Sequence, residues 1–182
     1  MRTQQGEVEV YGYRKGGGKM IVSIDIGTSY SSVCILGKDG RAVPVDVSTG
    51  TCMYGGKYSL PSAVFVDENG NILVGQAAMN SRKRIPQNFR MEFKRDLGQD
   101  IPVILGKREF RPRDLYTELF RHMAQRAVKT GGEPVEKAYL TYPASFGRKK
   151  KEQIAEAARE AGLFDIELVD EPTAAAMCYL DA

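Results

Sequence analysis

The sequence feature that most constrains the fold is a change of hydrophobic pattern near residue 113. Before it, short apolar segments rich in β-branched residues, such as Ile21–Ile26 and Ser32–Leu36, are separated by turn residues and indicate strands. After it, apolar residues recur at helical spacing from Leu115 to Val128. The further expected elements are a strand over 137–142, a helix over 148–161, a strand over 166–169 and a helix opened by Pro172. This order predicts an α/β fold whose mixed sheet carries helices on its faces.

The stretch between the first strands and the first helix is less regular. Val43–Val47 is a candidate third strand, and Leu60–Val66 and Ile72–Val74 are candidate strands around a turn at residues 67–70. A glycine-rich loop over residues 50–58 precedes them, and the residues from the end of the second strand, Val74, to about Arg113 are irregular and basic. We expect a small subdomain inserted into the main sheet at about residues 41–112.

Residues 1–19 differ from the remainder because they are polar and end in Gly16-Gly17-Gly18. We expect this stretch to be a flexible tail. A pair of glycines shortly before a methionine is also what a translated ribosome-binding site would give. We therefore expect Met20 to be the natural start of the protein.

The composition is that of a soluble globular chain. With 182 residues, 42% of them hydrophobic, it can bury a core of its own. No apolar run reaches the roughly 20 residues needed to cross a bilayer, and the N-terminus has no apolar signal segment, so we expect no membrane contact and a cytoplasmic location. The three cysteines, Cys34, Cys52 and Cys178, show no metal-binding spacing and are expected to be reduced and structural.

The charge pattern argues against a nucleic-acid role. The formal net charge is +3, and the basic residues are scattered among 23 acidic ones rather than gathered in a stripe. The densest basic run, Arg148–Lys151, could contact an anionic partner, but it also fits the solvated start of a helix, which is the interpretation that we favour. No nucleic-acid partner is expected.

The tip of the first hairpin carries groups that suit a nucleotide phosphate. Asp25 ends a buried strand, and Gly27 and then Thr28, Ser29, Tyr30 and Ser31 follow it. A glycine allows the backbone close to a phosphate, successive N–H groups in a tight turn form an anion-binding nest, and hydroxyls add donors. Asp25 offers a hard oxygen to Mg²⁺ or to its water shell. Taken alone, the motif is equally compatible with an ordinary hairpin turn.

Further motifs give the hairpin a context. Ile21–Leu36 resembles the first phosphate motif of the heat-shock protein 70 (Hsp70, DnaK) family of the actin-like ATPase superfamily. Four later segments resemble family motifs in the same order: Leu60–Val64 with Gly75–Ala78, Phe93–Gly98, Tyr142–Phe146 and Asp170–Ala176. The resemblance covers residues 21–182. It implies a ribonuclease H-like fold in which residues 20–182 are the N-terminal lobe of the nucleotide-binding domain.

The resemblance also implies roles for individual residues. Asp25 would face the Mg²⁺ shell, and residues 27–30 (Gly27, Thr28, Ser29 and Tyr30) would line the β- and γ-phosphates of ATP or ADP. Lys94 matches the family's catalytic lysine, whose cation offsets charge on the transferred phosphoryl group. Glu171 matches the glutamate that orients the attacking water. Pro143 matches a proline that couples nucleotide state to the interdomain linker.

Some residues depart from the family pattern. Lys151 stands where the family has the arginine that partners this proline, and a lysine cannot form the same two-pronged contact. Asp170 replaces the usual asparagine, and the stretch between Gly98 and Leu115 is shorter than in typical members. The lysine places coupling to a peptide-binding domain in doubt, and the shorter stretch implies a reduced inserted subdomain.

The family's second phosphate loop, adenosine-binding segment, linker and peptide-binding domain are expected beyond Ala182. The resemblance then implies a Mg-dependent ATPase and chaperone in the full-length protein, with unfolded client peptides, a J-domain protein and a nucleotide exchange factor as partners. The isolated chain is expected to bind Mg-ATP weakly and to turn it over negligibly. The alternatives are a sugar kinase or filament protein of the same superfamily, or a module that binds nucleotide without hydrolysis.

Two residue types invite other interpretations. His122, the one histidine, falls one position off the apolar stripe of its helix and is expected on the surface without a ligand role. Phe120, Phe146 and Phe164 occupy packing positions of helices and turns. They are expected in the core rather than in a base-stacking platform.

Overall fold

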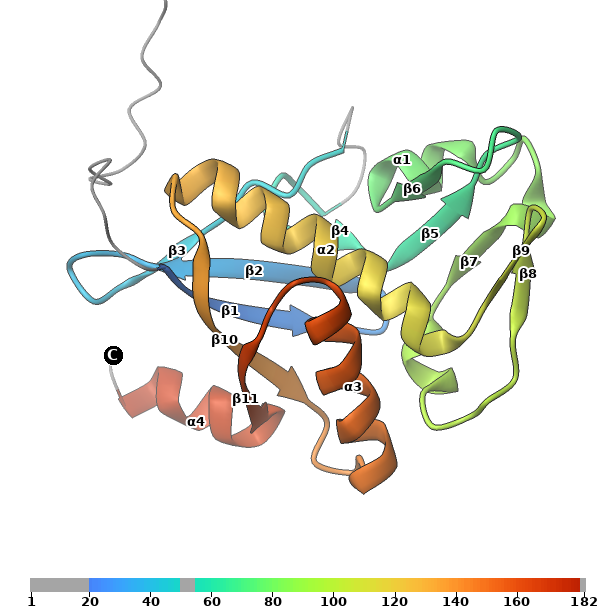
Figure 1. Ribbon diagram of the computed structural model, residues 1–182. Helices are drawn as coiled ribbons and strands as arrows, with labels where there is room; N and C mark the ends of the chain where they lie inside the picture. The colour runs from blue at the N-terminus through green and yellow to red at the C-terminus, as the bar shows by residue number, and fades with distance from the viewer. Residues whose placement is uncertain (1–19, 50–54, 181–182) are drawn as a thin grey trace, which may run out of the picture.

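The main element of the fold is a mixed sheet. The computed structural model describes residues 20–49 and 55–180. Its largest sheet has the order β11-β10-β1-β2-β3, and a short strand, β4, pairs with β2. The strands are β1 (Met20–Ile26), β2 (Tyr30–Leu36), β3 (Ala42–Pro44), β4 (Leu60–Pro61), β10 (Val135–Tyr142) and β11 (Asp165–Asp170). β1 runs antiparallel to β2 and parallel to β10, and β10 runs parallel to β11. The predicted mixed sheet is confirmed (Figure 1).

The period-two pattern of β1 decides which face of the sheet the helices cover. Val22, Ile24 and Ile26 are buried, while Ser23 and Asp25 between them are exposed. The buried side chains share one hydrophobic core with the apolar stripe of helix α2 (Pro112–Gly131), which consists of Leu115, Leu119, Met123 and Ala127. The predicted helix is therefore confirmed. It ends at Gly132, whose φ of 76° is left-handed and suits glycine.

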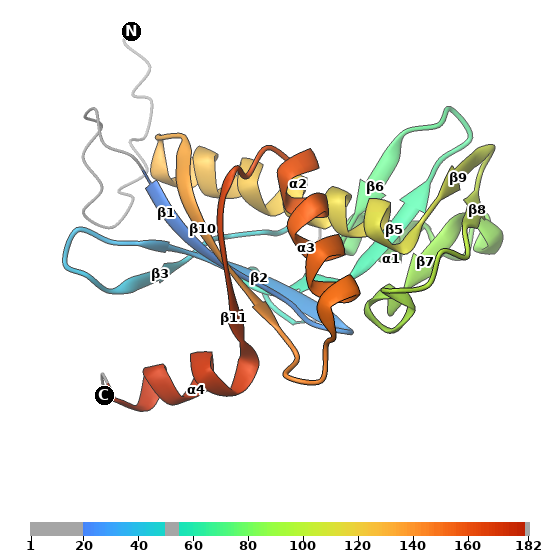
Figure 2. The ribbon, with the colours of Figure 1, turned by 60° about the horizontal axis from the view of Figure 1, so that its bottom comes forward.

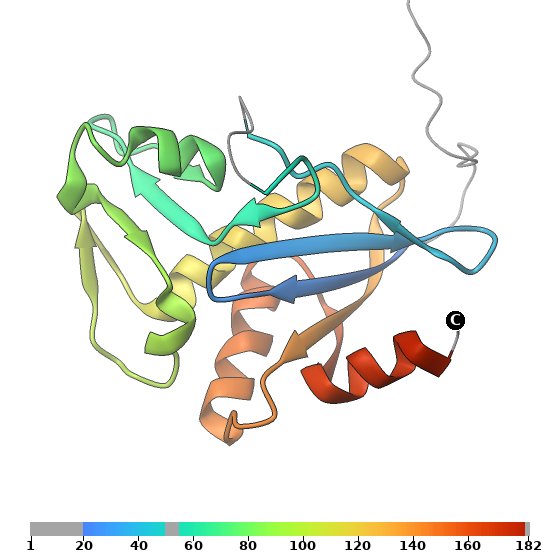
Figure 3. The same cartoon turned by 180° about the vertical axis from the view of Figure 1, so that it is seen from behind.

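Two more helices complete the layers. Helix α3 (Arg148–Glu160) lies beside α2 on the same face of the sheet, and α4 (Glu171–Leu180) leaves the end of β11 toward the opposite face (Figures 2 and 3). The basic run forms the first turn of α3, in which Arg148 and Lys149 are exposed, as expected for a solvated helix start, while Lys150 and Lys151 are half-buried. None of the helices described is long and apolar enough to cross a membrane.

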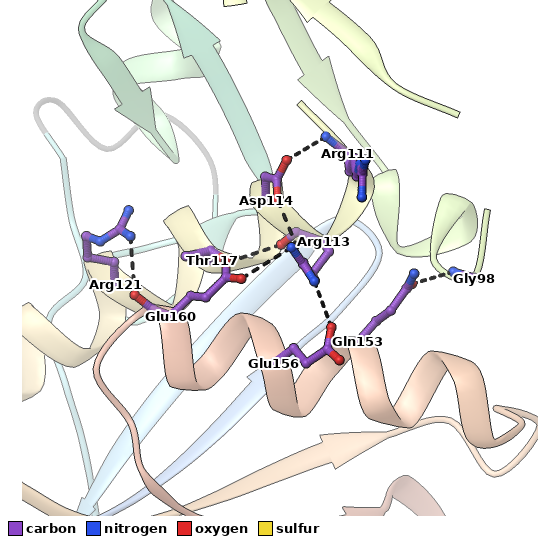
Figure 4. Close-up of polar contacts among 9 residues, drawn as sticks. All are labelled: Gly98, Arg111, Arg113, Asp114, Thr117, Arg121, Gln153, Glu156 and Glu160. Atoms are coloured by element: carbon purple, nitrogen blue, oxygen red, sulfur yellow. Dashed lines mark hydrogen bonds and ion pairs between the residues drawn. The ribbon is translucent and has the colours of Figure 1, made fainter. Parts of the chain in front are cut away.

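An arginine joins α2 to α3. Arg113 Nη1 donates to Glu156 Oε2 at 2.7 Å, and Arg113 Nη2 lies 3.2 Å from Glu160 Oε1. Thr117 Oγ1 on the next turn is 3.3 Å from Glu160 Oε2 (Figure 4). The two helices are thus held by several charge-assisted contacts in addition to their apolar packing.

The segment predicted to be irregular is ordered. It forms a second sheet of order β6-β5-β7, a hairpin of β8 and β9, and short helical turns. The elements are β5 (Ala63–Val66), β6 (Ile72–Val74), α1 (Gln76–Ser81), η1 (Pro86–Asn88), β7 (Phe89–Met91), η2 (Phe93–Asp96), β8 (Val103–Leu105) and β9 (Arg108–Phe110). The strands β5 and β6 fall within the segments expected as strands, whereas local composition concealed the other elements because each is only 3 to 6 residues long. An inserted subdomain at about 41–112 stays a prediction.

Two strand predictions need correction. The strand expected over Val43–Val47 is only β3, although Val45 N still donates to Val33 O at 3.0 Å and Val45 and Val47 are buried. The strand expected over Leu60–Val66 is divided at Ser62 into β4 and β5, which belong to different sheets. The backbone N–H of Ser62 instead donates to Ser29 O at 2.9 Å, and this bond takes the chain out of the β5 ladder.

Two side-chain expectations are also wrong. Phe164 is 79% exposed, because it lies in the turn between α3 and β11, whereas Phe120 is buried and Phe146 packs at the margin of the core. His122 is half-buried rather than on the surface, and its Nε2 lies 3.2 Å from Val47 O. The spacing of apolar residues on α2 could not predict this contact, because Val47 belongs to the loop after β3, which packs against α2 in the folded chain.

The cysteine expectation is met where it can be followed. Cys34 is a free thiol on β2, half-buried, and burial raises its pKa. A raised pKa makes the thiol a poor nucleophile at neutral pH. Cys52 and the predicted tail over residues 1–19 lie outside the described residues, as does part of the glycine-rich loop.

Candidate functional site

The candidate site lies where three parallel strands end. β1, β10 and β11 run in the same direction, so their carboxyl ends meet at one edge of the sheet. The hairpin tip follows β1, Pro143 follows β10, and Glu171 follows β11. Open α/β sheets bind ligands at this edge because loops and helix starts converge there around exposed backbone N–H groups. Parallel pairing therefore brings together three of the predicted motifs.

The hairpin tip needs a glycine. A Cβ at Gly27 would lie 2.2 Å from Tyr30 O, so any other residue would force the turn open. Thr28 is half-buried, and Ser29 and Tyr30 are exposed. The backbone thus turns tightly and presents polar side chains to solvent, as a phosphate-binding turn requires.

The side chain of Ser62 is hydrogen-bonded to this turn. Its Oγ donates to Gly27 O at 2.8 Å and lies 2.9 Å from Ser31 Oγ, with both serines buried. These side-chain bonds add to the backbone bond between Ser62 and Ser29 already described. The turn is therefore held by a residue 35 positions away in the chain. Sequence analysis placed Ser62 in a family motif but gave it no role.

Lys94 and Glu171 form an ion pair. Lys94 Nζ donates to Glu171 Oε1 at 2.7 Å, and the two residues are 77 positions apart. The lysine side chain is 10% exposed and the glutamate side chain 41%. Helix η2 supplies the lysine, with its neighbour Phe93 buried in the core, and the first turn of α4 supplies the glutamate. The structure thus brings together two residues that were chosen from separate motifs.

Asp25 lies at the same edge of the sheet as Glu171, with one oxygen engaged. Thr141 Oγ1 on β10 donates a short hydrogen bond to Asp25 Oδ1. The Asp25 side chain is exposed on the face of the sheet opposite α2, so its other oxygen is open to a ligand. Sequence analysis missed Thr141. The signal available was its penultimate position in the strand expected over 137–142, directly before the motif of Pro143.

The remaining predicted residues lie near the site without joining the ion pair. Pro143 begins the turn after β10, where Phe146 N donates to Pro143 O at 2.9 Å. Lys151 Nζ lies 4.4 Å from the centre of the Tyr142 ring, a cation–π contact with the residue before the proline. Lys151 therefore touches the neighbour of Pro143.

Asp170 has a structural explanation. Thr173 N donates to Asp170 Oδ1 at 2.8 Å, and Thr173 Oγ1 donates to Oδ2 at 2.8 Å. These bonds cap helix α4, and the backbone bond is the main reason that the pKa of Asp170 is lowered. Because aspartate and asparagine cap helices equally well, this departure from the family pattern preserves the start of α4 that positions Glu171.

A mixed sheet with a braced phosphate-type hairpin, a lysine and two carboxylates at its edge is the arrangement of an actin-like ATPase. The comparisons with known proteins narrow this class. A profile described as Hsp70 protein matches residues 101–180. Over 159 residues, 87% of this chain, the sequence is 36% identical to the chaperone protein DnaK of Elusimicrobium minutum, 33% to that of Methanothermobacter thermautotrophicus and 31% to that of Endomicrobium trichonymphae. The chain belongs to the Hsp70 family. It spans about a quarter of these relatives, with 25%, 26% and 25% of their lengths covered.

Proposed function

We propose that residues 20–182 are the first lobe of the nucleotide-binding domain of a DnaK-like chaperone, and that this lobe binds the phosphates of ATP or ADP with Mg²⁺. The observation that carries the proposal is the Lys94–Glu171 ion pair at 2.7 Å beside Asp25 at the carboxyl edge of the sheet. A cation, an ionised acid and an anion-binding turn are the groups that phosphoryl transfer to water requires.

The hairpin would hold the phosphates. The donors are the backbone N–H groups of residues 27–30 and the hydroxyls of Thr28 and Ser29. These groups are uncharged, so they would bind a phosphate through hydrogen bonds rather than through an ion pair. Ser62 fixes the carbonyl of Gly27 and keeps the turn in its binding shape before a ligand arrives. A preorganised turn loses little entropy on binding.

Lys94 and Glu171 would act on the terminal phosphate and on water. In the structure Lys94 is paired with the Glu171 carboxylate. A phosphate oxygen would take the place of this carboxylate or share the lysine with it. Charge neutralisation by Lys94 favours the transition state of transfer. Glu171, at the rim of the site, can accept a hydrogen bond from water and orient it toward phosphorus.

Asp25 fits a role toward Mg²⁺ through water. Within the described residues no cluster of three or more His, Cys, Asp or Glu side chains could hold a metal ion alone. Mg²⁺ bound with nucleotides usually takes one or two carboxylates, phosphates and water rather than a full protein cage. The ion would supply charge neutralisation of the phosphates, and Thr141 would keep the Asp25 carboxylate turned toward it.

In the whole protein, ATP hydrolysis would be coupled to the binding of unfolded client peptides, with a J-domain protein and a nucleotide exchange factor as co-chaperones. Pro143 and Lys151 are the proposed coupling residues. The contact of Lys151 with the Tyr142 ring supports this role, because movement of the turn after β10 would change the surroundings of the lysine.

The experiment is nucleotide binding and hydrolysis by the full-length gene product. We expect Mg-ATP binding by calorimetry and single-turnover hydrolysis, while the isolated 182-residue chain binds weakly and has negligible turnover. In the full-length protein Glu171→Gln should bind ATP normally and hydrolyse it slowly. A full-length protein that does not bind ATP would contradict the proposal, and robust phosphate release from the isolated chain would contradict the assignment of this lobe as half of a site.

A further inference from the structure

Tyr116 is a buried tyrosine that packs next to the residue that precedes Lys94. It lies on α2 and is 1% exposed. Its ring makes edge-to-face contacts with Phe93, at 5.8 Å between centroids, and with Phe120, at 6.0 Å. These contacts fix the ring in place. Phe93 is the chain neighbour of Lys94, so the ring packs directly against the element that carries the lysine.

The hydroxyl of Tyr116 has no hydrogen-bond partner among the described residues. Three other buried polar atoms share this property, but each belongs to a side chain that bonds through another atom: Gln76, Arg90 and Arg113. Tyr116 has no second polar atom. An unpaired buried hydroxyl costs free energy that a phenylalanine of the same shape would avoid, so the hydroxyl requires an explanation.

The hydroxyl belongs to a ring that packs on Phe93, the chain neighbour of Lys94, whose Nζ lies 2.7 Å from Glu171 Oε1. Burial is the main cause that raises the pKa of Tyr116, and the charges of Asp25 and Glu171 raise it further. The phenol therefore stays protonated and can only donate to the anions near it. Asp25 already accepts from Thr141, whereas the partner of Glu171 is Lys94, the residue that a phosphate would attract.

We propose that Tyr116 is a positioning residue that takes over from Lys94 as the hydrogen-bond donor to Glu171 when Lys94 turns to the phosphate. In the nucleotide-free site Lys94 donates to Glu171, and the Tyr116 hydroxyl has no hydrogen-bond partner among the described residues. When a phosphate draws the ammonium away, the phenol donates to the freed carboxylate and keeps it ionised and aimed at water. This inference rests on the function proposed above.

The test is Tyr116→Phe in the full-length protein, which removes one oxygen and leaves the ring packing intact. We expect kcat for ATP hydrolysis to fall roughly 10- to 100-fold, the range of a hydrogen bond to a charged group, with KM little changed. The nucleotide-free variant should be as stable as the wild type or more so, since the lost hydroxyl had no partner. Tyr139→Phe, which removes a hydroxyl from β10, is the matched control and should leave kcat unchanged.

A double-mutant cycle tests whether the effect passes through Glu171. If it does, Tyr116→Phe combined with Glu171→Gln should hydrolyse ATP no more slowly than Glu171→Gln alone. Additive losses, or a wild-type kcat in Tyr116→Phe, would overturn the inference. A wild-type protein without ATPase activity would instead refute the proposed function, so the two failures are distinguishable.

Discussion

Two charged clusters of the molecule differ in how many carboxylate partners each cation has. Lys94 at the carboxyl edge of the sheet pairs with one carboxylate, that of Glu171. Arg113 between α2 and α3 contacts both Glu156 and Glu160, and also approaches Asp114 at 3.8 Å. Both clusters have a contact of 2.7 Å, so distance alone does not separate them.

The number of partners and the location do separate them. A guanidinium that contacts several carboxylates from two helices is fixed, because moving it would break all of these contacts together. A lysine with a single carboxylate partner can exchange that partner for a phosphate at little cost. The comparison indicates that the geometry of an ion pair does not reveal a function, and that the proposed role of Lys94 and Glu171 depends on their place at the edge of the sheet where the hairpin also lies.

The largest expected effect that distinguishes the clusters is on hydrolysis. Lys94→Met in the full-length protein should reduce kcat for ATP by about 100-fold or more, since it removes a cation from the developing charge on phosphate. Arg113→Met is the control and should leave kcat per folded molecule unchanged. Single-turnover phosphate release measures both, and equal losses in the two variants would contradict the distinction.

The second effect is on stability. Arg113→Met should lower the free energy of unfolding by roughly 1 to 3 kcal/mol, because Glu156 and Glu160 lose a shared charged donor. Arg148→Met is the control. The Arg148 side chain is 92% exposed, so the loss of its ion pair with Glu152 should not change the free energy of unfolding measurably. Urea unfolding of the variants measures the difference. A larger loss for Arg148→Met would show that α2 and α3 are not held by this cluster.

A third prediction concerns the support of the hairpin. Ser62→Ala leaves Gly27 O and Ser31 Oγ without their buried partner, so we expect a loss of about 1 to 2 kcal/mol in stability and weaker ATP binding. Ser23→Ala, on the exposed face of β1, is the control. Unchanged nucleotide affinity in Ser62→Ala, measured by calorimetry, would show that the turn keeps its shape without the serine.

The smallest effect concerns pH. Burial, followed by the charge of Arg126, lowers the pKa of His122 from its ordinary value of 6.5, although the bond to Val47 O opposes this. The unfolded chain therefore binds a proton more readily, and the stability that neutral His122 contributes is present above pH 6.5 and is lost as the pH falls toward the lowered value. His122→Gln should flatten the decline in stability between pH 7 and pH 5. An unchanged decline would show that other groups cause it.

Much of the fold followed from local pattern. The helix over α2 and the parallel strands were predictable because long periodic segments leave few alternatives. In the second sheet β5 and β6 fall within expected strands, but β7 was not predictable, since it has 3 residues and pairs with β5, which is distant in sequence. The strand expected over Val43–Val47 was predicted too long, because alternating valines also occur in a loop whose side chains are buried, as those of Val45 and Val47 are.

The candidate site divides in the same way. Lys94 and Glu171 could be chosen as site residues because each lay in a recognisable motif, but neither motif reveals that the two side chains touch. Ser62, Thr141 and Tyr116 could not, because their significance lies in a neighbour that only the folded chain supplies. Phe164 is the converse case, an aromatic residue at a helix end whose burial local spacing overestimates.

The bond between Thr141 and Asp25 joins residues 116 positions apart, and this separation has a consequence during synthesis. At roughly 5 to 20 residues per second, about 6 to 23 seconds pass between the addition of Asp25 and that of Thr141. Throughout that interval the β1–β2 hairpin lacks β10, its parallel neighbour. Until β10 has been synthesised, Asp25 therefore lacks the Thr141 hydroxyl as its hydrogen-bond donor, and the candidate site can be completed only late in the synthesis of this segment.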